Sequence, residues 1–260
     1  MLDSQDIKAS LQSRLNTKFV GRQLYYYHRL ATTMKTAKEL VKKETAEGTV
    51  VIAGTQTAGK GRIGRTWLSP VGSLAMSVIL KPSVDNLPQL VMIASLAVVR
   101  AIKKVTGLKT QIKWPNDVLV KNKKVCGILI ENEVKGGKVN SAIIGIGINV
   151  NFDPLDFPEI TGIATSLSHE IGTEISKVEL TSTLLSELER LYLEAQAGAP
   201  VYREWQENME TLGRWIKVKN GETVEQGKAE TVTENGNLVL RRADGSLTEI
   251  VAGDVTIIKE

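Results

Sequence analysis

The segment GKGRIGRTW, residues 59–67 and here called the glycine loop, combines glycines with cations. Between Gly59 and Arg65 it contains three glycines, Lys60, Arg62 and Arg65, and no acidic residue. Glycines let backbone N–H groups approach a ligand closely, and the cations neutralise negative charge. The composition predicts a loop that binds a polyanion, and a solvated surface loop is the simpler alternative.

The glycine loop matches two phosphate-binding patterns without satisfying either. Gly54 and Gly59-Lys60 have the spacing of a Walker loop, but Gly61 stands where Ser or Thr should hold magnesium. The spacing of Gly59, Gly61 and Gly64 also fits a dinucleotide fingerprint, which requires a helix directly after the loop. Residues 50–54 and 74–80 are instead typical of buried strands, so the loop joins two strands and we reject both interpretations.

Three other segments carry polar groups suited to the same anionic ligand. KWPND, residues 113–117, supplies a cation, an amide and a carboxylate; Lys123 and Lys124 precede the apolar run 125–130; and GIGINVN, residues 145–151, ends a strand with small residues and two amides. We expect these segments and the glycine loop to form one site.

In this order, the segments resemble the motifs of biotin protein ligases. The family's loop Gly-Arg-Gly-Arg-x-Gly-Arg-x-Trp appears as GKGRIGRTW with Lys60 at its first arginine, and KWPND, a lysine before GILIE, and GIGIN follow. The resemblance runs from about Tyr25 to the C-terminus. It implies an enzyme that uses ATP and Mg²⁺ to convert biotin into biotinyl-AMP and pyrophosphate, then transfers biotin to a lysine of a biotin carboxyl carrier protein.

The resemblance also assigns residues by motif position. Catalytic roles fall on Lys124 and Arg62, and no metal ligand is assigned. The residues implied for biotin are Thr32, Thr33, Gln56, Gly59, Lys60, Gly61, Arg62, Lys124 and Gly127. Those implied for ATP are Arg62, Arg65, Trp67, Lys113, Trp114, Asn116, Asp117 and Asn149.

Structural alternatives exist for several of these residues. Thr32 and Thr33 are also typical helix caps, Trp67 could fill the core, and Asp117 could be a turn residue. Gly127 is expected to allow close approach without taking part in the chemistry. For the whole protein, the alternatives are a lipoate-type acyl ligase and a nucleic-acid-binding module that uses the basic loop without ATP.

The elements that must position these groups follow from hydrophobic periodicity. We predict helices over 7–15, from Thr32 or Thr33 through 46, from 86 or 87 to 106, and over 179–195, with a helical extension at 200–210. Strands are predicted over 24–28, 50–54, 74–80, 124–135 and 138–151, the last two joined by Gly136-Gly137. From Gly213 onward, short alternating runs separated by turns predict a small β-barrel.

The predicted fold class is therefore α/β or α+β, with a mixed sheet packed against helices. The resemblance implies the architecture shared by class II aminoacyl-tRNA synthetases and biotin synthetases over residues 1–212, and an SH3-like barrel over 213–260.

Composition limits the remaining possibilities. The 260 residues are 42% hydrophobic with a net charge of +4, which is enough apolar content for a core and too little charge to indicate nucleic acid. No apolar run reaches the roughly 18 residues of a membrane span, and the N-terminus lacks a signal-peptide pattern. We expect a cytoplasmic protein with no membrane or DNA partner, because the residues before Tyr25 are too few for a DNA-binding domain. A homodimer is possible. Cys126, His28 and His169 lack metal-ligand spacing and are expected to be structural.

Overall fold

The structure is a computed structural model that describes residues 4–258, and its larger sheet has seven strands. Their order is β1-β2-β3-β7-β6-β5-β4. Only β1 and β2 are parallel, so the sheet is mixed, as the sequence predicts. The strands are β1 Leu24–Leu30, β2 Val50–Gln56, β3 Leu74–Leu80, β4 Gln111–Lys113, β5 Asp117–Val120, β6 Lys123–Lys135 and β7 Lys138–Ile148.

The glycine loop lies in the connection between β2 and β3, as predicted. Every side chain of β3 is buried, and Val50 to Ala53 of β2 are buried too, because both strands are covered on their two faces. The connection contains only one three-residue 3₁₀ turn, Arg62–Gly64. No helix therefore follows the loop, so neither phosphate motif applies.

The longest strands, β6 and β7, form the predicted hairpin. Gly136 and Gly137 have φ values of 55° and 75°. Positive φ at both central residues is the geometry of a type I′ turn, whose twist matches that of the paired strands. The hairpin carries Lys124 and Gly127 on one strand and Gly147 on the other.

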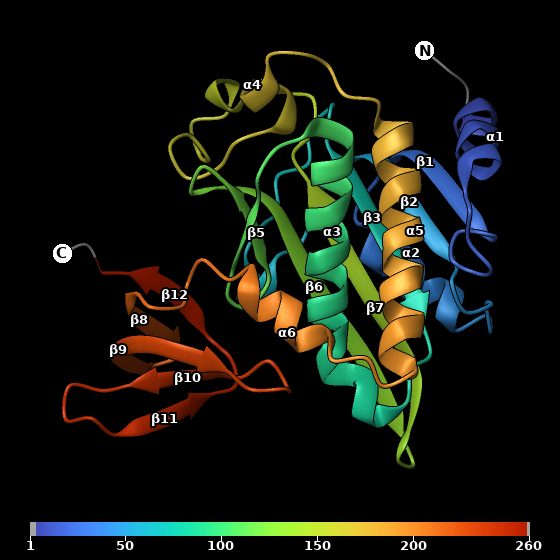
Figure 1. The fold of residues 1–260 in the computed structure, drawn as a ribbon. Helices are drawn as coiled ribbons and strands as arrows, with labels where there is room; N and C mark the ends of the chain where they lie inside the picture. The colour runs from blue at the N-terminus through green and yellow to red at the C-terminus, as the bar shows by residue number, and fades with distance from the viewer. Residues whose placement is uncertain (1–3, 259–260) are drawn as a thin grey trace.

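Helices cover both faces of the large sheet. In Figure 1, α3, Leu90–Thr106, and α5, Lys177–Gln196, lie side by side across one face, and α2, Thr33–Val41, lies behind the sheet. The helix α3 begins three to four residues later than predicted, because residues 84–89 form a 3₁₀ turn that contains Pro88. The helix α2 ends at Val41, before the predicted end at residue 46.

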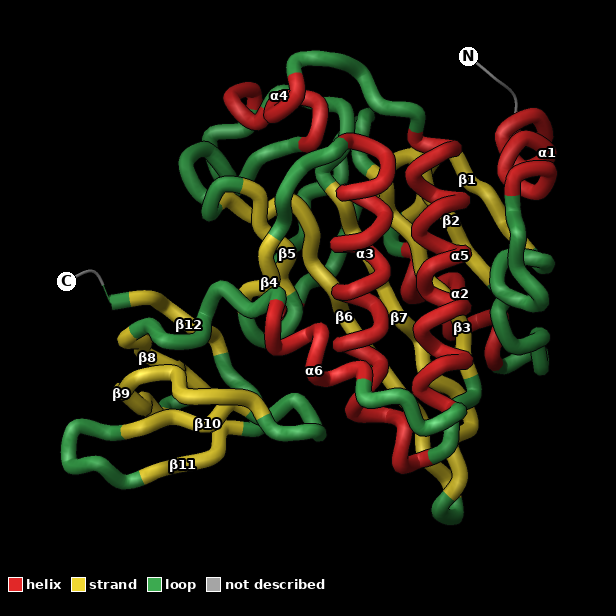
Figure 2. Tube along the Cα trace, viewed as in Figure 1, coloured by secondary structure: helices red, strands yellow, loops and turns green. Residues whose placement is uncertain are grey.

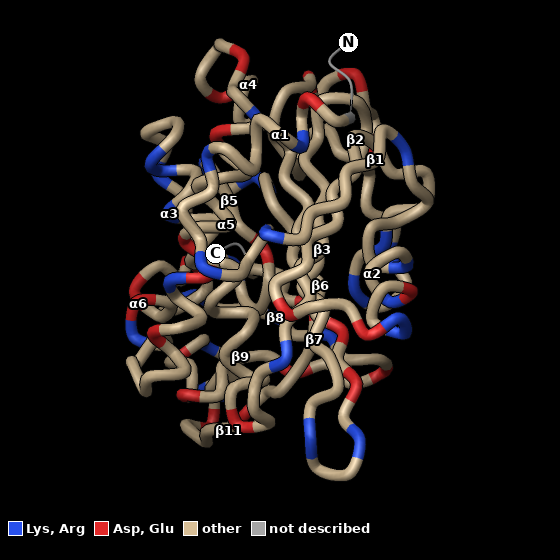
Figure 3. The backbone as a smooth tube through the Cα atoms, turned by 90° about the vertical axis from the view of Figure 1, so that its right-hand side faces the viewer, with Lys and Arg blue, Asp and Glu red and all other residues tan. Residues whose placement is uncertain are grey.

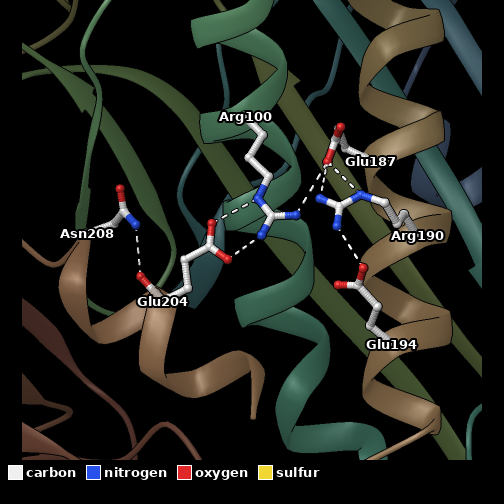
Figure 4. Close-up of polar contacts among 6 residues, drawn as sticks. All are labelled: Arg100, Glu187, Arg190, Glu194, Glu204 and Asn208. Carbon is white, nitrogen blue, oxygen red and sulfur yellow. Dashed lines mark hydrogen bonds and ion pairs between the residues drawn. The ribbon is translucent and has the colours of Figure 1, made fainter. Parts of the chain in front are cut away.

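The remaining helices are short and lie at the edges. These are α1, Ser4–Arg14, close to the predicted range, α4, Leu167–Ile171, which was not predicted, and α6, Val201–Glu207, within the predicted extension. Arg100 of α3 joins the helical layer through bonds to Glu204 of α6 and Glu187 of α5 (Figure 4). Its planar guanidinium can bind both carboxylates at once, which fixes the three helices relative to one another.

The C-terminal strands form a separate five-stranded antiparallel sheet, ordered β11-β10-β9-β8-β12. It lies next to α6 (Figure 2). The indole Nε1 of Trp114 donates to the carbonyl of Gly236 at 2.9 Å, linking the two parts. A division into domains at residues 212 and 213 stays a prediction. The strands are β8 Trp215–Asn220, β9 Thr223–Val232, β10 Leu238–Arg241, β11 Leu247–Ile250 and β12 Asp254–Ile257.

Charges of both signs are spread over the chain. In the view of Figure 3, Lys and Arg are interspersed with Asp and Glu around α2 and the C-terminal strands. The net charge therefore says little about a partner, and the local grouping of cations is more informative. Within residues 4–258, no helix combines the length and apolar character needed to cross a membrane.

Candidate active site

A cavity of about 120 Å³ lies where α2, the glycine loop, β6 and β7 meet, with Asp254 of the C-terminal sheet on its wall. Most of the residues implied by the sequence line it: Thr32, Thr33, Gln56, Lys60, Gly61, Arg62, Arg65, Trp67, Asn116, Asp117, Lys124 and Gly127. Segments almost one hundred residues apart in the sequence are thus brought to one place by the strand order.

The start of α2 forms one polar wall of the cavity. The side-chain oxygen of Gln56 accepts from the Thr33 amide at 2.8 Å and from the Thr33 hydroxyl at 3.3 Å, and Ser77 donates to that hydroxyl at 2.8 Å. Gln56 therefore caps the helix. Thr32 occupies the N-cap position without a side-chain cap bond, so capping does not account for its hydroxyl. That hydroxyl and the Gln56 amide nitrogen have no hydrogen-bond partner among the described residues.

Asn116 holds Arg62 over the cavity. Its side-chain oxygen accepts from Arg62 at 2.9 Å, while its side-chain nitrogen donates to the Ile128 carbonyl at 2.6 Å. The backbone carbonyl of Asn116 accepts from the Ile128 amide at 3.0 Å. Because Asn116 is fixed to β6 through both its backbone and its side chain, it presents its oxygen to Arg62 in a defined position.

The glycine loop is closed on itself and anchored to the C-terminal sheet. The Gly61 amide donates to the Arg65 carbonyl at 2.7 Å, and the Trp67 amide donates to the Gly59 carbonyl at 2.9 Å. Arg65 forms an ion pair of 2.6 Å with Asp254, the first residue of β12. Two side-chain contacts, those of Arg62 and Arg65, thus hold the cationic part of the loop in place.

The Lys124 side chain lines the cavity, and hydrogen bonds hold its backbone in place. Its amide donates to the Ile163 carbonyl at 3.0 Å and its carbonyl accepts from Thr165 at 2.9 Å. The ammonium forms an ion pair of 2.6 Å with Asp117 and lies 5.4 Å from the centre of a Trp67 ring. Asp117 begins β5 and pairs with Gly127, so the alternative that it is only a turn residue is wrong.

Trp67 lies over two glycines of the β6–β7 hairpin. A Cβ at Gly147 would collide with the indole, and one at Gly127 would lie 2.9 Å from the indole carbon Cζ3. The indole nitrogen is buried and has no hydrogen-bond partner among the described residues. Trp67 therefore packs on the cavity wall, where it contacts both the loop and the hairpin.

Four implied residues do not line the cavity. Asn149 is buried and donates to the Thr165 carbonyl at 2.9 Å, and Trp114 is buried and faces Gly236. Lys113 is on β4, paired with Asp117, and a Cβ at Gly59 would collide with the Trp67 carbonyl. A role of these four residues in binding biotin or ATP stays a prediction.

Other lining residues were not assigned from the sequence. The sequence pattern GIGIN predicts that Gly145 and Gly147 let another group approach the strand backbone closely. No sequence pattern points to Asp254, because only the folded chain brings β12 to the loop. The full set is Met34, Thr66, Met76, Ile128, Leu129, Gly145, Ile146, Gly147 and Asp254.

Of the four cations that line the cavity, Arg62 and Lys124 are half-buried, and Lys60 and Arg65 are exposed. Burial lowers the pKa of the Arg62 guanidinium from its ordinary value, and the carboxylates of Asp254 and Asp117 oppose this shift. Arg62 stays protonated, so it keeps a positive charge that a bound anion would stabilise. Burial also raises the pKa of the Cys126 thiol, which is therefore an unreactive core group, as expected.

The described residues contain no group of three or more His, Cys, Asp and Glu side chains arranged to hold a metal ion. The carboxylates on the cavity wall are Asp117 and Asp254, and each is paired with a cation. Mg²⁺ is commonly held by substrate phosphates, waters and one or two carboxylates. These two carboxylates therefore suit Mg²⁺ only when it binds together with a phosphate-bearing ligand.

Two family models match the chain. Residues 26–149 match the biotin/lipoate A/B protein ligase family, and residues 211–257 match the biotin protein ligase C-terminal domain. The first match contains the whole glycine loop and the second contains the C-terminal sheet through Ile257.

Curated relatives match most of the chain. It is 37% identical over 256 residues to the bifunctional ligase/repressor BirA of Bacillus subtilis, covering 96% of this chain and 78% of the relative. It is 33% identical over 204 residues to the biotin--[acetyl-CoA-carboxylase] ligase of Paracoccus denitrificans, covering 75% of this chain and 85% of the relative.

Solved structures show the same fold. The biotin protein ligase of Aquifex aeolicus in complex with biotin and ATP matches with a TM-score of 0.80 and 29% identity, covering 92% of this chain and all of that one. The biotin protein ligase of Leishmania major in complex with biotinyl-5-AMP matches with a TM-score of 0.62 and 26% identity, over 89% of this chain and 99% of that one.

Proposed function

The chain belongs to the biotin protein ligase family, and from that premise we propose that it activates biotin with ATP and transfers it to a carrier protein. One observation carries the proposal: uncommitted hydrogen-bonding groups of Thr32 and Gln56 and the cations of the glycine loop line a single cavity with Lys124. A cavity with these two kinds of group suits a ligand that has a neutral polar end and an anionic end. Biotin, with its ureido ring and its carboxylate, has this character.

The polar wall fits the ureido ring. That ring offers one carbonyl acceptor and two N–H donors, and buried polar groups of a ligand must be paired to avoid a desolvation penalty. Among residues 4–258, the Thr32 hydroxyl and the Gln56 amide nitrogen have no hydrogen-bond partner, while Gln56 is held in place through Thr33. We propose that Thr32, Thr33 and Gln56 bind the ring and that Gly127 leaves room for it beside β6.

The cations fit the reaction step. The biotin carboxylate attacks the α-phosphorus of ATP, forming the acyl–phosphate bond of biotinyl-AMP as the bond to pyrophosphate breaks. Two like unit charges about 4 Å apart repel by roughly 4 kcal/mol at an effective dielectric near 20. Lys124, Lys60 and Arg62 reduce this repulsion and stabilise the charge that accumulates on the phosphate oxygens in the transition state.

Magnesium would arrive with the nucleotide. Asp117 would share the ion once the phosphate draws the Lys124 ammonium away from it. Magnesium would supply further neutralisation of the leaving pyrophosphate. Arg65 and Trp67 would contact the nucleotide, and Asn116 would act through Arg62, which it positions.

In the second step the amine of a carrier lysine attacks the acyl carbon, forming an amide as AMP leaves. The relatives named as ligases of acetyl-CoA carboxylase indicate a biotin carboxyl carrier protein as the acceptor. A homodimer and the lack of a DNA-binding role stay predictions.

Transfer to a carrier separates this proposal from its closest alternative. The purified protein should label a biotin carboxyl carrier domain with biotin in the presence of Mg-ATP, and should not label a lipoyl domain with lipoate under the same conditions. A bicyclic ureido ring offers hydrogen bonds that the dithiolane of lipoate lacks, and such groups left unpaired discriminate strongly. Lipoate transfer in preference to biotin would assign the site to a lipoate-type ligase.

The glycine loop should become protected when the ligands bind. The cavity of about 120 Å³ is smaller than the roughly 300 Å³ at the low end of ligand pockets, so we expect the loop to open when biotin and ATP enter. Bound anions then hold its cations. Tryptic cleavage after Lys60, Arg62 and Arg65 should slow with biotin and Mg-ATP, while cleavage at the hairpin tip, Lys135 and Lys138, should not change. Equal cleavage of the loop with and without ligands would contradict this.

A further inference from the structure

A second cavity, of about 260 Å³, lies between the first turns of α5, the helix α1 and the strands β1 and β2. It shares no lining residue with the candidate active site. Its wall is mainly apolar, formed by Ile7 and Leu11 of α1, Ile52 of β2, Leu74 of β3, and Ile175 and Val178 near the start of α5. The cavity is open to solvent on one side, and a ligand of matching shape would remove its apolar wall from water.

One cation, Lys177, and one carboxylate, Glu174, line this mainly apolar cavity. Lys177 is half-buried, and its ammonium has a single polar contact among the described residues, the Ser73 carbonyl at 3.5 Å. It forms no ion pair with any described carboxylate. Burial lowers the pKa of Lys177, and Glu174, an exposed residue that also lines the cavity, opposes this shift without forming an ion pair.

The position of Lys177 in α5 makes this isolation costly for stability. It is the first residue of the helix, after the N-cap Ser176, whose hydroxyl accepts from the Glu179 amide at 3.2 Å. The helix dipole is positive at this end and disfavours a cation. Desolvation, the lack of an ion pair and the helix dipole all disfavour the charged form of this ammonium. An anion bound beside it would offset all three, and the free N–H groups of the first turn would also attract the anion.

The polar groups near the cavity complete a small-molecule site. Tyr26 lines it, with its hydroxyl 3.2 Å from where a Cβ of Gly54 would lie, so glycine at 54 leaves space for the phenol. Ser73, Asn151, Ser176 and Thr181 also line the cavity, but apolar atoms form most of its wall. A ligand must therefore combine one negative charge with an aliphatic body.

We propose that this second cavity binds a small aliphatic carboxylate, with its chain against Ile52 and Val178 and its carboxylate at the Lys177 ammonium. The residues that line this second cavity have no role in the proposed reaction with biotin.

Calorimetric titration with octanoate, compared with the neutral octanamide, tests the proposal on the full chain. Octanoate should bind once per chain. Lys177→Met, which removes the charge and keeps the length, should weaken octanoate binding by about tenfold or more and leave octanamide unchanged. Val178→Phe, which fills the cavity, should weaken both ligands. Lys43→Met, on the exposed end of the α2 region, should weaken neither.

Two results would overturn the proposal. One is octanoate binding that is absent, or that persists undiminished in both Lys177→Met and Val178→Phe. The other is displacement of octanoate by saturating biotin, which would place it in the candidate active site. Circular dichroism of each variant establishes that it is folded, and if Lys177→Met is not, the comparison of Val178→Phe with Lys43→Met decides the question.

Discussion

Replacing Lys124 with alanine should lower the rate of biotinyl-AMP formation by about 10²- to 10³-fold, the usual effect of removing one donor that stabilises developing charge. The backbone at this position is held by Ile163 and Thr165, so the truncation leaves the strand in place. The side chain is partly exposed and its ion pair with Asp117 contributes only on the order of 0–1 kcal/mol to stability. The activity should therefore fall far more than the free energy of unfolding.

The matched control is Lys123→Ala, which removes the neighbouring exposed lysine of β6. Its rate should stay near that of the parent protein. The rates are compared as pyrophosphate release at saturating biotin and Mg-ATP, and stability as the midpoint of urea unfolding. A Lys124→Ala protein with a normal rate would show that Lys124 has only a structural role.

Replacing Arg62 with glycine should release the reactive intermediate. Arg62 lies over the cavity on Asn116, and losing a charge-assisted hydrogen bond to the adenylate phosphate costs roughly 1.5–3 kcal/mol, about a ten- to hundredfold loss in affinity. Biotinyl-AMP that escapes acylates exposed lysines of any protein. Arg62→Gly should therefore still form the adenylate while labelling bystander proteins that the parent leaves unlabelled.

The measurement is biotin incorporation into albumin with Mg-ATP and no carrier. Arg62→Lys, which keeps the charge but not the planar fork, should give less labelling than Arg62→Gly. If parent and Arg62→Gly label albumin equally while both form adenylate, Arg62 does not retain the intermediate. If the loop instead bound nucleic acid, the substitution would change only salt-dependent binding.

The elements that hold the site could be predicted where the sequence pattern is local. The buried runs around the glycine loop and the Gly136-Gly137 turn specify two strands and a hairpin with no other information. The short strands β4 and β5 were missed because three or four residues are too few to show alternation. The 3₁₀ turn before α3 was missed for a related reason, since its residues are compatible with a helical start.

Side-chain directions could not be predicted, because they depend on contacts between distant segments. Trp114 and Asn149 belong to motifs of the family, yet the first turns toward Gly236 and the second toward Thr165. Asp254 reaches Arg65 only because the C-terminal sheet packs beside the loop. Gln56, by contrast, was implied by motif position, and its cap on Thr33 emerged only in the structure.

The most direct test of the central claim is formation of biotinyl-AMP without any carrier. The purified protein is incubated with saturating biotin, Mg-ATP labelled at the α-phosphate, and pyrophosphatase, and the products are separated by chromatography. Labelled biotinyl-AMP should accumulate to about one equivalent per chain, because the cavity already contains every group that we assign to the first step. No adenylate from folded protein, or an adenylate formed with lipoate and not with biotin, would contradict the account.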